Sequence, residues 1–401
     1  MTPVVDYFTL IGAAVRTVLT APWPQNWRRF KWLFIFAIIW PLLRLTSVIT
    51  LLLDHVLYPG FRKQKIVKPL FIVGNLRTGS TLMYRTLAED TENFACFRML
   101  DAFMPAISLK RAVAFIGRVD AWLGGYGARV VQYLDNAFLD EYSRIHDTGF
   151  LKPEEDEFAL LNYMCSASMY ELFPMVRRFR RLFFVDQEMS TAEQDRVMRR
   201  YKKLVKRQLY FAGGNKRFLS KNPLFTNKLG VLRRTFPDAR FACLVRHPVN
   251  TVLSTASLFH FVWHETGALA PNQQDMGTVL EFCRCFYNQP RDCLHDLGPK
   301  QLCVMQYDEL VSNPGGAMRG MLNRFEFPVS GNLDEILLGI GKRQKRFKSQ
   351  HTYSLDAWGV TESEIYEQFH DVYDEHNYSR PEAATAAVPL PIVNANEASA
   401  S

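Results

Sequence analysis

Short apolar runs alternate with long amphipathic patterns through the middle of this 401-residue chain. Helical spacing of apolar residues covers Thr191 to Phe211 and Met276 to Tyr287. Strand candidates lie near residues 69–73, 216–220, 240–245 and 302–306. Buried parallel strands have such continuous apolar runs, and helical crossovers connect them. The alternation therefore predicts an α/β fold of three layers, a central parallel sheet flanked by helices.

The N-terminal part of the chain has a different pattern. Leu33 to Leu53 is an apolar stretch of membrane-spanning length, interrupted by Pro41 and Arg44. Basic residues flank it on both sides, so the orientation in a membrane cannot be predicted. The stretch could span a bilayer, form an interfacial or re-entrant hairpin bent at Pro41, or cover an apolar face of the main domain. We expect an apolar helical extension over 1–65, a catalytic domain over 66–380 and a disordered Ala/Pro-rich tail over 381–401.

The first apolar run of the main domain opens into an anion-binding sequence. After Leu70 to Val73 comes Gly74-Asn75-Leu76-Arg77-Thr78-Gly79-Ser80-Thr81-Leu82. A strand, a glycine-flanked loop and a helix start bring free backbone N–H groups together around a phosphate-like anion. The spacing from Gly74 to Gly79 is that of a P-loop, but Ser80 stands where an NTPase needs lysine. The pattern predicts a P-loop-like fold that binds an anion through Arg77 rather than a nucleoside triphosphate.

A second candidate anion site follows the apolar run at 240–245. Arg246-His247-Pro248 closes that run, and proline is favoured at the first position of a helix. Ser254 lies eight residues after Arg246, about two helical turns further on. Arginine supplies a planar fork of donors and serine a neutral donor, so the two side chains can hold one phosphate.

These motifs resemble those of the sulfotransferase family. The loop from Gly74 to Thr81 resembles the family's 5′-phosphosulfate loop, and Arg246 with Ser254 resembles its 3′-phosphate site. Three further segments occur in the family's order, and the resemblance covers roughly residues 66–375. They are Phe218-Leu219-Ser220-Lys221-Asn222-Pro223, which resembles the strand ending in a catalytic lysine; Tyr307-Asp308-Glu309-Leu310 with Asn313-Pro314; and Lys348 to Leu355 with Trp358-Gly359, which resembles the C-terminal box of the carbohydrate and bacterial-type branch.

The resemblance implies transfer of a sulfuryl group from 3′-phosphoadenosine 5′-phosphosulfate (PAPS) to an acceptor hydroxyl, leaving 3′,5′-adenosine bisphosphate. Arg77 and Lys221 are expected to stabilise the charge that develops during in-line attack. No metal is expected, because a sulfuryl group carries less charge than a phosphoryl group. The expected donor-binding residues are Arg77, Thr78, Gly79, Ser80, Thr81, Leu82, Arg246, Ser254, Tyr307 and Lys348. Tyr307 could equally be a core residue, and Lys348 could equally lie in a solvated basic segment.

The general base is expected in an acidic segment. Cytosolic sulfotransferases place a histidine two residues after the lysine, where this chain has Pro223. Pro153-Glu154-Glu155-Asp156-Glu157 resembles an acidic segment of the bacterial-type branch, so Glu155 or Asp156 is the predicted base. The alternative is an ordinary helix start, which favours proline and acids. The next candidate bases are His146, His247, His260 and His264. Leu82 replaces a tryptophan that stacks on adenine in many cytosolic members, so the adenine contact stays unassigned.

Composition narrows the partners and the compartment. The net charge is +8, but the basic clusters lack a nucleic-acid-binding motif and suit an anionic donor or lipid surface. Seven cysteines without a CxxC pair indicate a reducing compartment and no zinc site. We therefore expect a membrane-associated enzyme with its catalytic domain in the cytoplasm, or else a soluble cytoplasmic one. Its acceptor would be a lipid, another lipophilic alcohol or a glycan, and the oligomeric state is not indicated. The alternatives are a P-loop kinase or NTPase and a non-catalytic, membrane-associated nucleotide-binding protein.

Overall fold

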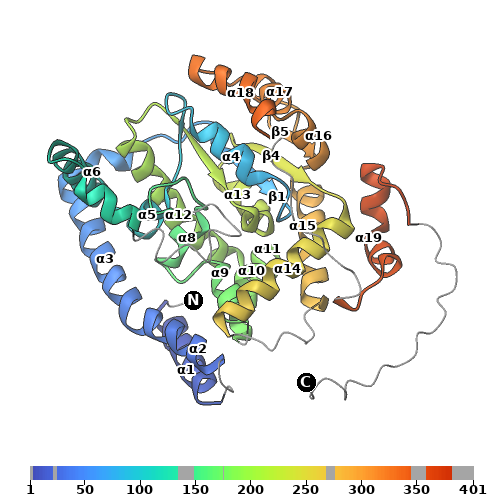
Figure 1. Cartoon of the computed structure of the whole chain (residues 1–401), viewed down its shortest axis with the longest axis horizontal. Coiled ribbons are helices and arrows are strands. Elements are labelled where there is room, and N and C mark those ends of the chain that lie inside the picture. The colour runs from blue at the N-terminus through green and yellow to red at the C-terminus, as the bar shows by residue number, and fades with distance from the viewer. Residues whose placement is uncertain are drawn as a thin grey trace, which may run out of the picture.

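The centre of the molecule is a five-stranded, fully parallel sheet with the order β2-β3-β1-β4-β5 (Figure 1). The computed structural model describes residues 3–20, 25–133, 149–174, 176–267, 276–344 and 358–381. Four strands lie within one residue of the predicted runs, and the two-residue β2 was not predicted. The strands are β1 Leu70–Gly74, β2 Phe94–Ala95, β3 Arg217–Lys221, β4 Arg240–Val245 and β5 Leu302–Gln306.

Helices cover both faces of the sheet, which confirms the predicted three-layer, P-loop-like α/β fold (Figure 1). Alternate residues of β1 belong to different hydrophobic cores, since successive side chains of a strand point to opposite faces. Phe71 and Val73 pack against α12 Thr191–Phe211, α13 Leu229–Thr235 and α15 Met276–Leu294. Leu70 and Ile72 pack against α4 Ser80–Ala88, α17 Pro314–Arg324 and α18 Gly331–Gln344.

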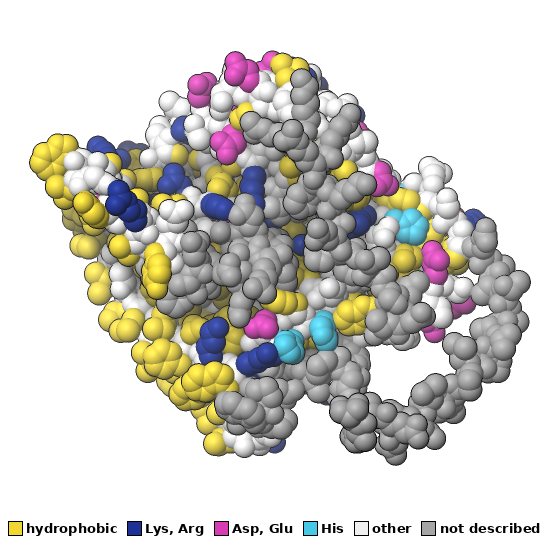
Figure 2. Space-filling view, viewed as in Figure 1, with side chains coloured by type: hydrophobic (Ala, Val, Ile, Leu, Met, Phe, Trp, Pro, Cys, Tyr) yellow, Lys and Arg dark blue, Asp and Glu magenta, His cyan; other side chains and the backbone are white. Residues whose placement is uncertain are grey.

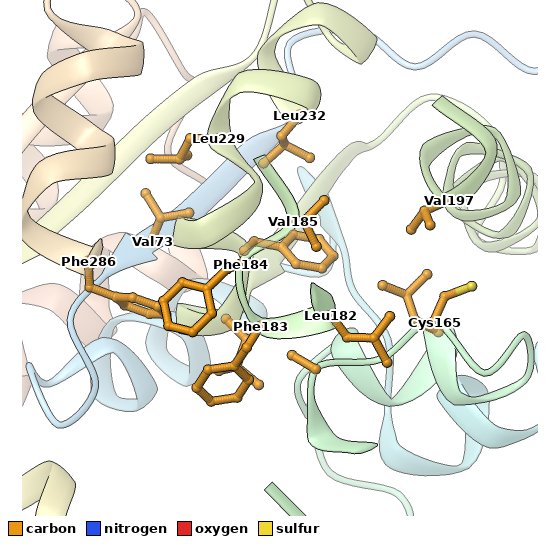
Figure 3. Packing of buried hydrophobic residues seen from close by; sticks show 14 of the residues in the cluster. Val73, Cys165, Leu182, Phe183, Phe184, Val185, Val197, Leu229, Leu232 and Phe286 are labelled. Atoms are coloured by element: carbon orange, nitrogen blue, oxygen red, sulfur yellow. The ribbon is translucent and has the colours of Figure 1, made fainter. Parts of the chain in front are cut away.

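The first of these cores is rich in aromatic side chains. Figure 3 shows Val73 of β1 below Leu229 of α13 and close to Phe184 and Phe286. The ring centroid of Phe183 lies 4.6 Å from that of Phe282. Such close packing fixes the sheet relative to the helices, and therefore fixes where the strand ends lie.

The two helices predicted from the sequence are present. Helix α12 has the predicted bounds and begins with a capping box of Ser190 and Glu193. Helix α15 continues past the predicted end at Tyr287 to Leu294. The other described helices are α1 Pro3–Thr20, α2 Gln25–Phe34, α3 Trp40–Leu57, α5 Met99–Phe103, α6 Ile107–Trp122, α8 Glu157–Leu161, α9 Ser168–Leu172, α10 Arg180–Phe183, α11 Val185–Glu188, α14 Pro248–Thr266, α16 Tyr307–Ser312 and α19 Glu362–His376, with a π-helical turn at Ile35–Ile39 and 3₁₀ turns at Pro59–Lys63, Arg177–Phe179 and Pro223–Lys228.

The predicted apolar extension is helical. Helix α2, the π turn and α3 follow one another without a break from Gln25 to Leu57. Pro41 lies in the first turn of α3 and does not end the helix, because the wider π turn precedes it. Within the described residues, Trp27–Leu57 is the one helix that is long and apolar enough to cross a membrane by length and composition. The predicted tail beyond Pro381 and the segment containing Lys348 lie outside the described residues.

Candidate active site

The loop after β1 is fixed by close backbone contacts. Gly74 has a φ of +116°, and a Cβ atom there would lie 2.1 Å from the carbonyl oxygen of Leu244. Only glycine fits this approach of β1 to β4. The Thr226 hydroxyl accepts a hydrogen bond from the Gly74 N–H at 2.8 Å and donates one to the Gly74 carbonyl at 3.0 Å. The end of β1 is therefore held from two sides.

The loop ends in a helix start that suits an anion. The first amides of α4 have no intrahelical acceptor, as at the start of any α-helix, and Gly79, which has a φ of +78°, provides no side-chain cap for them. Ser80, Thr81 and Leu82 form the first turn of this helix. Thr78 donates to the Asn75 carbonyl at 2.8 Å, which shapes the loop from inside.

Three predicted donor-binding residues that are far apart in sequence come together beside this loop. The Nε of Arg77 donates to the Oγ of Ser254 at 3.4 Å, and Nη1 of Arg246 donates to the Arg77 carbonyl at 3.1 Å. Arg77 itself has a left-handed φ of +62°, a conformation that costs an L-residue about 1–2 kcal/mol. Backbone strain of this kind is concentrated at functional sites.

Arg246 is held in place while part of its guanidinium stays available. Its guanidinium carbon lies 4.3 Å from the ring centroid of Tyr307, a cation–π distance. Tyr287, which the sequence did not single out, donates its hydroxyl to the Arg246 carbonyl, and its oxygen lies at hydrogen-bond distance, 3.0 Å, from the Thr251 hydroxyl. Within the part of the chain that the structure describes, the buried Nε of Arg246 has no hydrogen-bond partner. A spare arginine donor beside free helix amides matches the needs of a phosphate or sulfate group.

Lys221 stands at the same edge of the sheet, at the end of β3. It pairs in register with Ile72 of β1, the strand that carries the loop. Its side chain is 2% exposed, and its Nζ lies 2.5 Å from Oε1 of Glu155, which is 18% exposed. A lysine without a partner would be costly to bury here, so Glu155 compensates the Lys221 charge.

Asp156 lies in a different environment from its neighbour Glu155. Its buried carboxyl group accepts hydrogen bonds from the Tyr201 hydroxyl and, at 2.9 Å, from the Ser220 hydroxyl. Burial raises the pKa of Asp156 to about 7, although both hydroxyl groups oppose this shift. Of the two acids that the sequence left open, Glu155 is the one beside Lys221, and Asp156 supports the core between α12 and β3.

Further carboxyl groups surround the Lys221–Glu155 pair. Glu157 is buried and pairs with Lys228 at 3.2 Å. Burial raises the pKa of Glu171 to about 8, and the charges of Glu155 and Glu157 add to this shift. Glu171 was not predicted as a site residue; its signal in the sequence is a single charge within the apolar segment from residue 167 to 176.

The other candidate bases are histidines whose described contacts do not include Lys221 or Glu155. The His247 ring packs against Tyr373 and Tyr378, and burial lowers its pKa. His260 packs against Trp358, and His264 contacts the neighbouring Glu265. His146 and Lys348 lie outside the described residues. Among the described residues, no group of His, Cys, Asp and Glu side chains is arranged to hold a metal ion.

The sequence was compared with profiles of known protein families. A profile of the sulfotransferase family matches residues 69–331, the region that carries the loop, Lys221, Arg246 and Ser254. This chain therefore belongs to the sulfotransferase family.

Individual relatives are distant but cover most of the chain. It is 22% identical over 327 residues to the omega-hydroxy-beta-dihydromenaquinone-9 sulfotransferase Stf3 of Mycobacterium bovis, covering 79% of this chain and 77% of that one, and the Mycobacterium tuberculosis protein gives the same values. The fold is similar to the crystal structure of sulfotransferase STF9 from Mycobacterium avium, with a TM-score of 0.67, 19% identity, and coverage of 90% and 89%. Sulfotransferase STF1 from M. tuberculosis gives a TM-score of 0.62 at 18% identity, with coverage of 91% and 92%.

Proposed function

We propose that this sulfotransferase moves a sulfuryl group from PAPS to the hydroxyl group of a lipid or another lipophilic alcohol. One observation carries the proposal: Arg77, Arg246 and Ser254 meet beside the β1 loop, and the Lys221–Glu155 pair stands at the end of the adjacent strand. Ligands of parallel α/β sheets bind at this carboxyl edge, where the strand order changes direction. When bound, the donor supplies an activated sulfuryl group with 3′,5′-adenosine bisphosphate as its leaving group.

The donor-binding residues divide into two groups. Arg77 and the amides from Gly79 to Thr81 would hold the 5′-phosphosulfate, because cationic and N–H donors converge there. Arg246 and Ser254 would hold the 3′-phosphate, and Tyr307 supports the Arg246 guanidinium from behind. These donors are of the type that binds anions. The predicted contact from Lys348 stays an implication of the family resemblance.

Lys221 and Glu155 would carry the chemistry. Glu155 takes the proton of the acceptor hydroxyl as its oxygen forms a bond to sulfur. The bond from sulfur to the bridging oxygen breaks in the same step, and negative charge builds on that oxygen and on the sulfuryl oxygens. Arg77 and Lys221 are fixed cations that can stabilise this charge, and they need little reorganisation during the reaction. Glu155 would replace the histidine that Pro223 makes impossible at its usual place.

Three observations support a lipophilic acceptor and a membrane-associated enzyme. The M. bovis relative is named for a hydroxylated dihydromenaquinone, although it is only 22% identical. The N-terminal helix has the length and composition of a membrane segment. All seven cysteines are free thiols, which suits a catalytic domain in the reducing cytoplasm. On this proposal residues 66–380 form the catalytic unit, residues 1–65 bring it to the membrane, and residues 381–401 are a tail.

A radiolabel transfer assay tests the reaction. Purified protein is incubated with ³⁵S-labelled PAPS and a bacterial membrane-lipid extract, and the label is followed into the organic phase. We expect labelled lipid with the wild type and about 10²–10⁴-fold slower labelling with Lys221→Ala. Label in a water-soluble product instead would indicate a glycan acceptor. If no product forms although 3′,5′-adenosine bisphosphate binds, the protein is a non-catalytic nucleotide-binding protein, and tight binding of ATP instead would indicate a kinase or NTPase.

A further inference from the structure

The long N-terminal helix exposes an unbroken apolar stripe. Its exposed residues recur at intervals of three and four along α3, which places them on one face of a helix. Leu52 is 62% exposed and Val56 is 76% exposed. The stripe consists of Ile38, Leu42, Leu45, Ile49, Leu52 and Val56. Figure 2 shows the hydrophobic surface running along this edge of the molecule.

Neighbouring helices widen the stripe into a face. Helix α1 contacts α2, and α6 contacts α3, so their exposed side chains extend the same surface at both ends (Figures 1 and 2). Phe8 of α1, Trp27 and Phe30 of α2, and Phe115 and Trp122 of α6 are exposed, with Trp122 at 85%. Large exposed apolar surfaces on a protein mark an interaction site. We call this surface, formed by α1, α2, α3 and α6, the apolar face.

The opposite side of the long helix is tied to the catalytic domain at several points. Near one end, Arg29 donates to the Gly267 carbonyl at 2.9 Å. Near the other end, the buried Asp54 pairs with Arg207 of α12 at 2.9 Å and accepts a hydrogen bond from the Ile107 N–H at the start of α6. These anchors are 25 residues apart, so they hold about 37 Å of helix against the domain. A helix held along this length cannot leave the domain to cross a bilayer by itself.

The charges on these helices suit an anionic surface. In the described parts of α1 to α3 and in residues 107–133, the acids are Asp6, Asp54 and Asp120. Asp6 and Asp54 are buried in ion pairs, and Asp120 accepts hydrogen bonds from backbone amides of residues 127 and 128. The exposed cations on the same segments are Arg16, Lys31, Arg111, Arg118 and Arg129. Basic side chains around an apolar face attract anionic lipid headgroups.

We propose that the apolar face docks in the plane of an anionic membrane, with α3 lying along the bilayer surface and the catalytic domain above it. A second copy of the chain is the other apolar partner that a stripe of this spacing could take. A coiled coil, however, places charged residues beside the apolar seam, and from residue 38 to 57 the charged residues are Arg44 and the buried Asp54. The width of the face and its one-sided positive charge favour lipid.

The docked arrangement also places the membrane beside the proposed acceptor site, a point that rests on the proposed function. Nη1 of Arg29 donates to the carbonyl of Leu172 at 3.4 Å, so α2 touches α9. Glu171, the residue before Leu172, is close enough to Glu155 for the two charges to influence each other. In this arrangement α2 and α9 lie between the docked membrane and the proposed acceptor side of the site.

Vesicle flotation of the full-length protein tests the docking face. We expect the protein to float with vesicles of phosphatidylcholine and phosphatidylglycerol and to float much less with phosphatidylcholine alone. The double variant Leu45→Asp/Leu52→Asp should lower the vesicle-bound fraction at least tenfold. Leu338→Asp is the matched control, since Leu338 is 72% exposed on α18, on the other side of the sheet from α12. All variants should still bind 3′,5′-adenosine bisphosphate, which separates loss of docking from loss of the proposed donor site.

Brominated lipids then distinguish docking from spanning. Bromine near the headgroups should quench the fluorescence that Trp40→Phe removes, and bromine at the bilayer centre should not, because Trp40 lies near the middle of the candidate span Trp27–Leu57. Stronger quenching from the centre would show a spanning helix and overturn the proposal. So would failure to float with anionic vesicles. Light scattering that shows a dimer, lost in Leu45→Asp/Leu52→Asp, would assign the face to a second copy of the chain.

Discussion

Replacing Arg246 by alanine separates a phosphate-binding arginine from a merely structural one. In the structure its guanidinium lies over Tyr307 at 4.3 Å and uses one N–H on the Arg77 carbonyl, which leaves the buried Nε without a partner among the described residues. If the free donors hold the 3′-phosphate of the donor, Arg246→Ala removes a buried, charge-assisted contact. Only ligands with a 3′-phosphate should be sensitive to that loss.

The expected magnitude follows from the type of contact. Hydrogen bonds to charged groups contribute about 1.5–3 kcal/mol, and truncating one partner of a buried charge pair costs about 2–5 kcal/mol. We expect a loss of about 2–4 kcal/mol, which is about a 30- to 900-fold weaker affinity for 3′,5′-adenosine bisphosphate. Ser254 supplies one hydrogen bond to the same charged group, so Ser254→Ala should cost about 1.5–3 kcal/mol, or about 13- to 160-fold.

Isothermal titration calorimetry with two nucleotides measures this effect. The wild type should bind 3′,5′-adenosine bisphosphate far more tightly than 5′-AMP, and Arg246→Ala should remove most of that difference. Arg319→Ala is the control, because Arg319 pairs with Asp334 on the surface of α17 and α18. Equal affinity of the wild type for both nucleotides would refute the assignment. An equal loss for both nucleotides in Arg246→Ala would show that Arg246 acts only by holding the loop at Arg77.

Four further outcomes test the remaining assignments. In steady-state kinetics with saturating acceptor, Lys221→Ala and Glu155→Gln should lower kcat about 10²–10⁴-fold, whereas full turnover in Glu155→Gln would place the base elsewhere. Because burial raises the pKa of Asp156 from 3.8 to about 7, the folded state keeps a proton that the unfolded state loses between these values. Stability from this group should therefore fall as pH rises through 7, and thermal melts of Asp156→Asn should show a flatter pH dependence than the wild type; parallel curves would contradict the shift. Asp54→Ala leaves Arg207 buried without its partner, so denaturant titration should show a loss of about 3–5 kcal/mol in the free energy of unfolding, and unchanged stability would contradict the anchoring role of this pair. Activity should persist after dialysis against EDTA, and its recovery only on adding a divalent metal would contradict the metal-free chemistry.

The main elements of the fold could be predicted because their signals are local. The strands β1, β4 and β5 have apolar runs, and α12 has both an amphipathic pattern and a capping residue. The strand β3 has only the apolar pair Phe218-Leu219, and its prediction came with the resemblance of residues 218–223 to the strand that ends in a catalytic lysine. The strand β2, Phe94–Ala95, was missed because two residues are too few to form a pattern. It exists because β3 offers an open edge beside it, which is a property of the assembled sheet.

The residues of the candidate site could be predicted from the sequence only in part. The motifs indicated two anion-binding groups, Arg77 in the loop and Arg246 with Ser254, and the sheet order brings these groups together. The sequence could not choose between Glu155 and Asp156, because adjacent acids in one segment look alike. Their environments differ because Tyr201 of α12 and Ser220 of β3 close over Asp156, whereas Glu155 lies beside Lys221. Those partners are 45 to 66 residues away, so only the folded chain brings them to the acids.

The N-terminal helix shows most clearly which properties follow from the sequence and which follow from the tertiary structure. Its sequence alone determined that residues 33–53 form an apolar helix, because composition and length are local properties. Which side of that helix meets protein was decided by tertiary structure: Arg207 of α12, 153 residues after Asp54, and the start of α6 hold one side. The other side stays exposed because no described element packs over it. Hydrophobicity sets how much surface must leave water, but the distant ionic and polar partners determine which part the protein itself can cover.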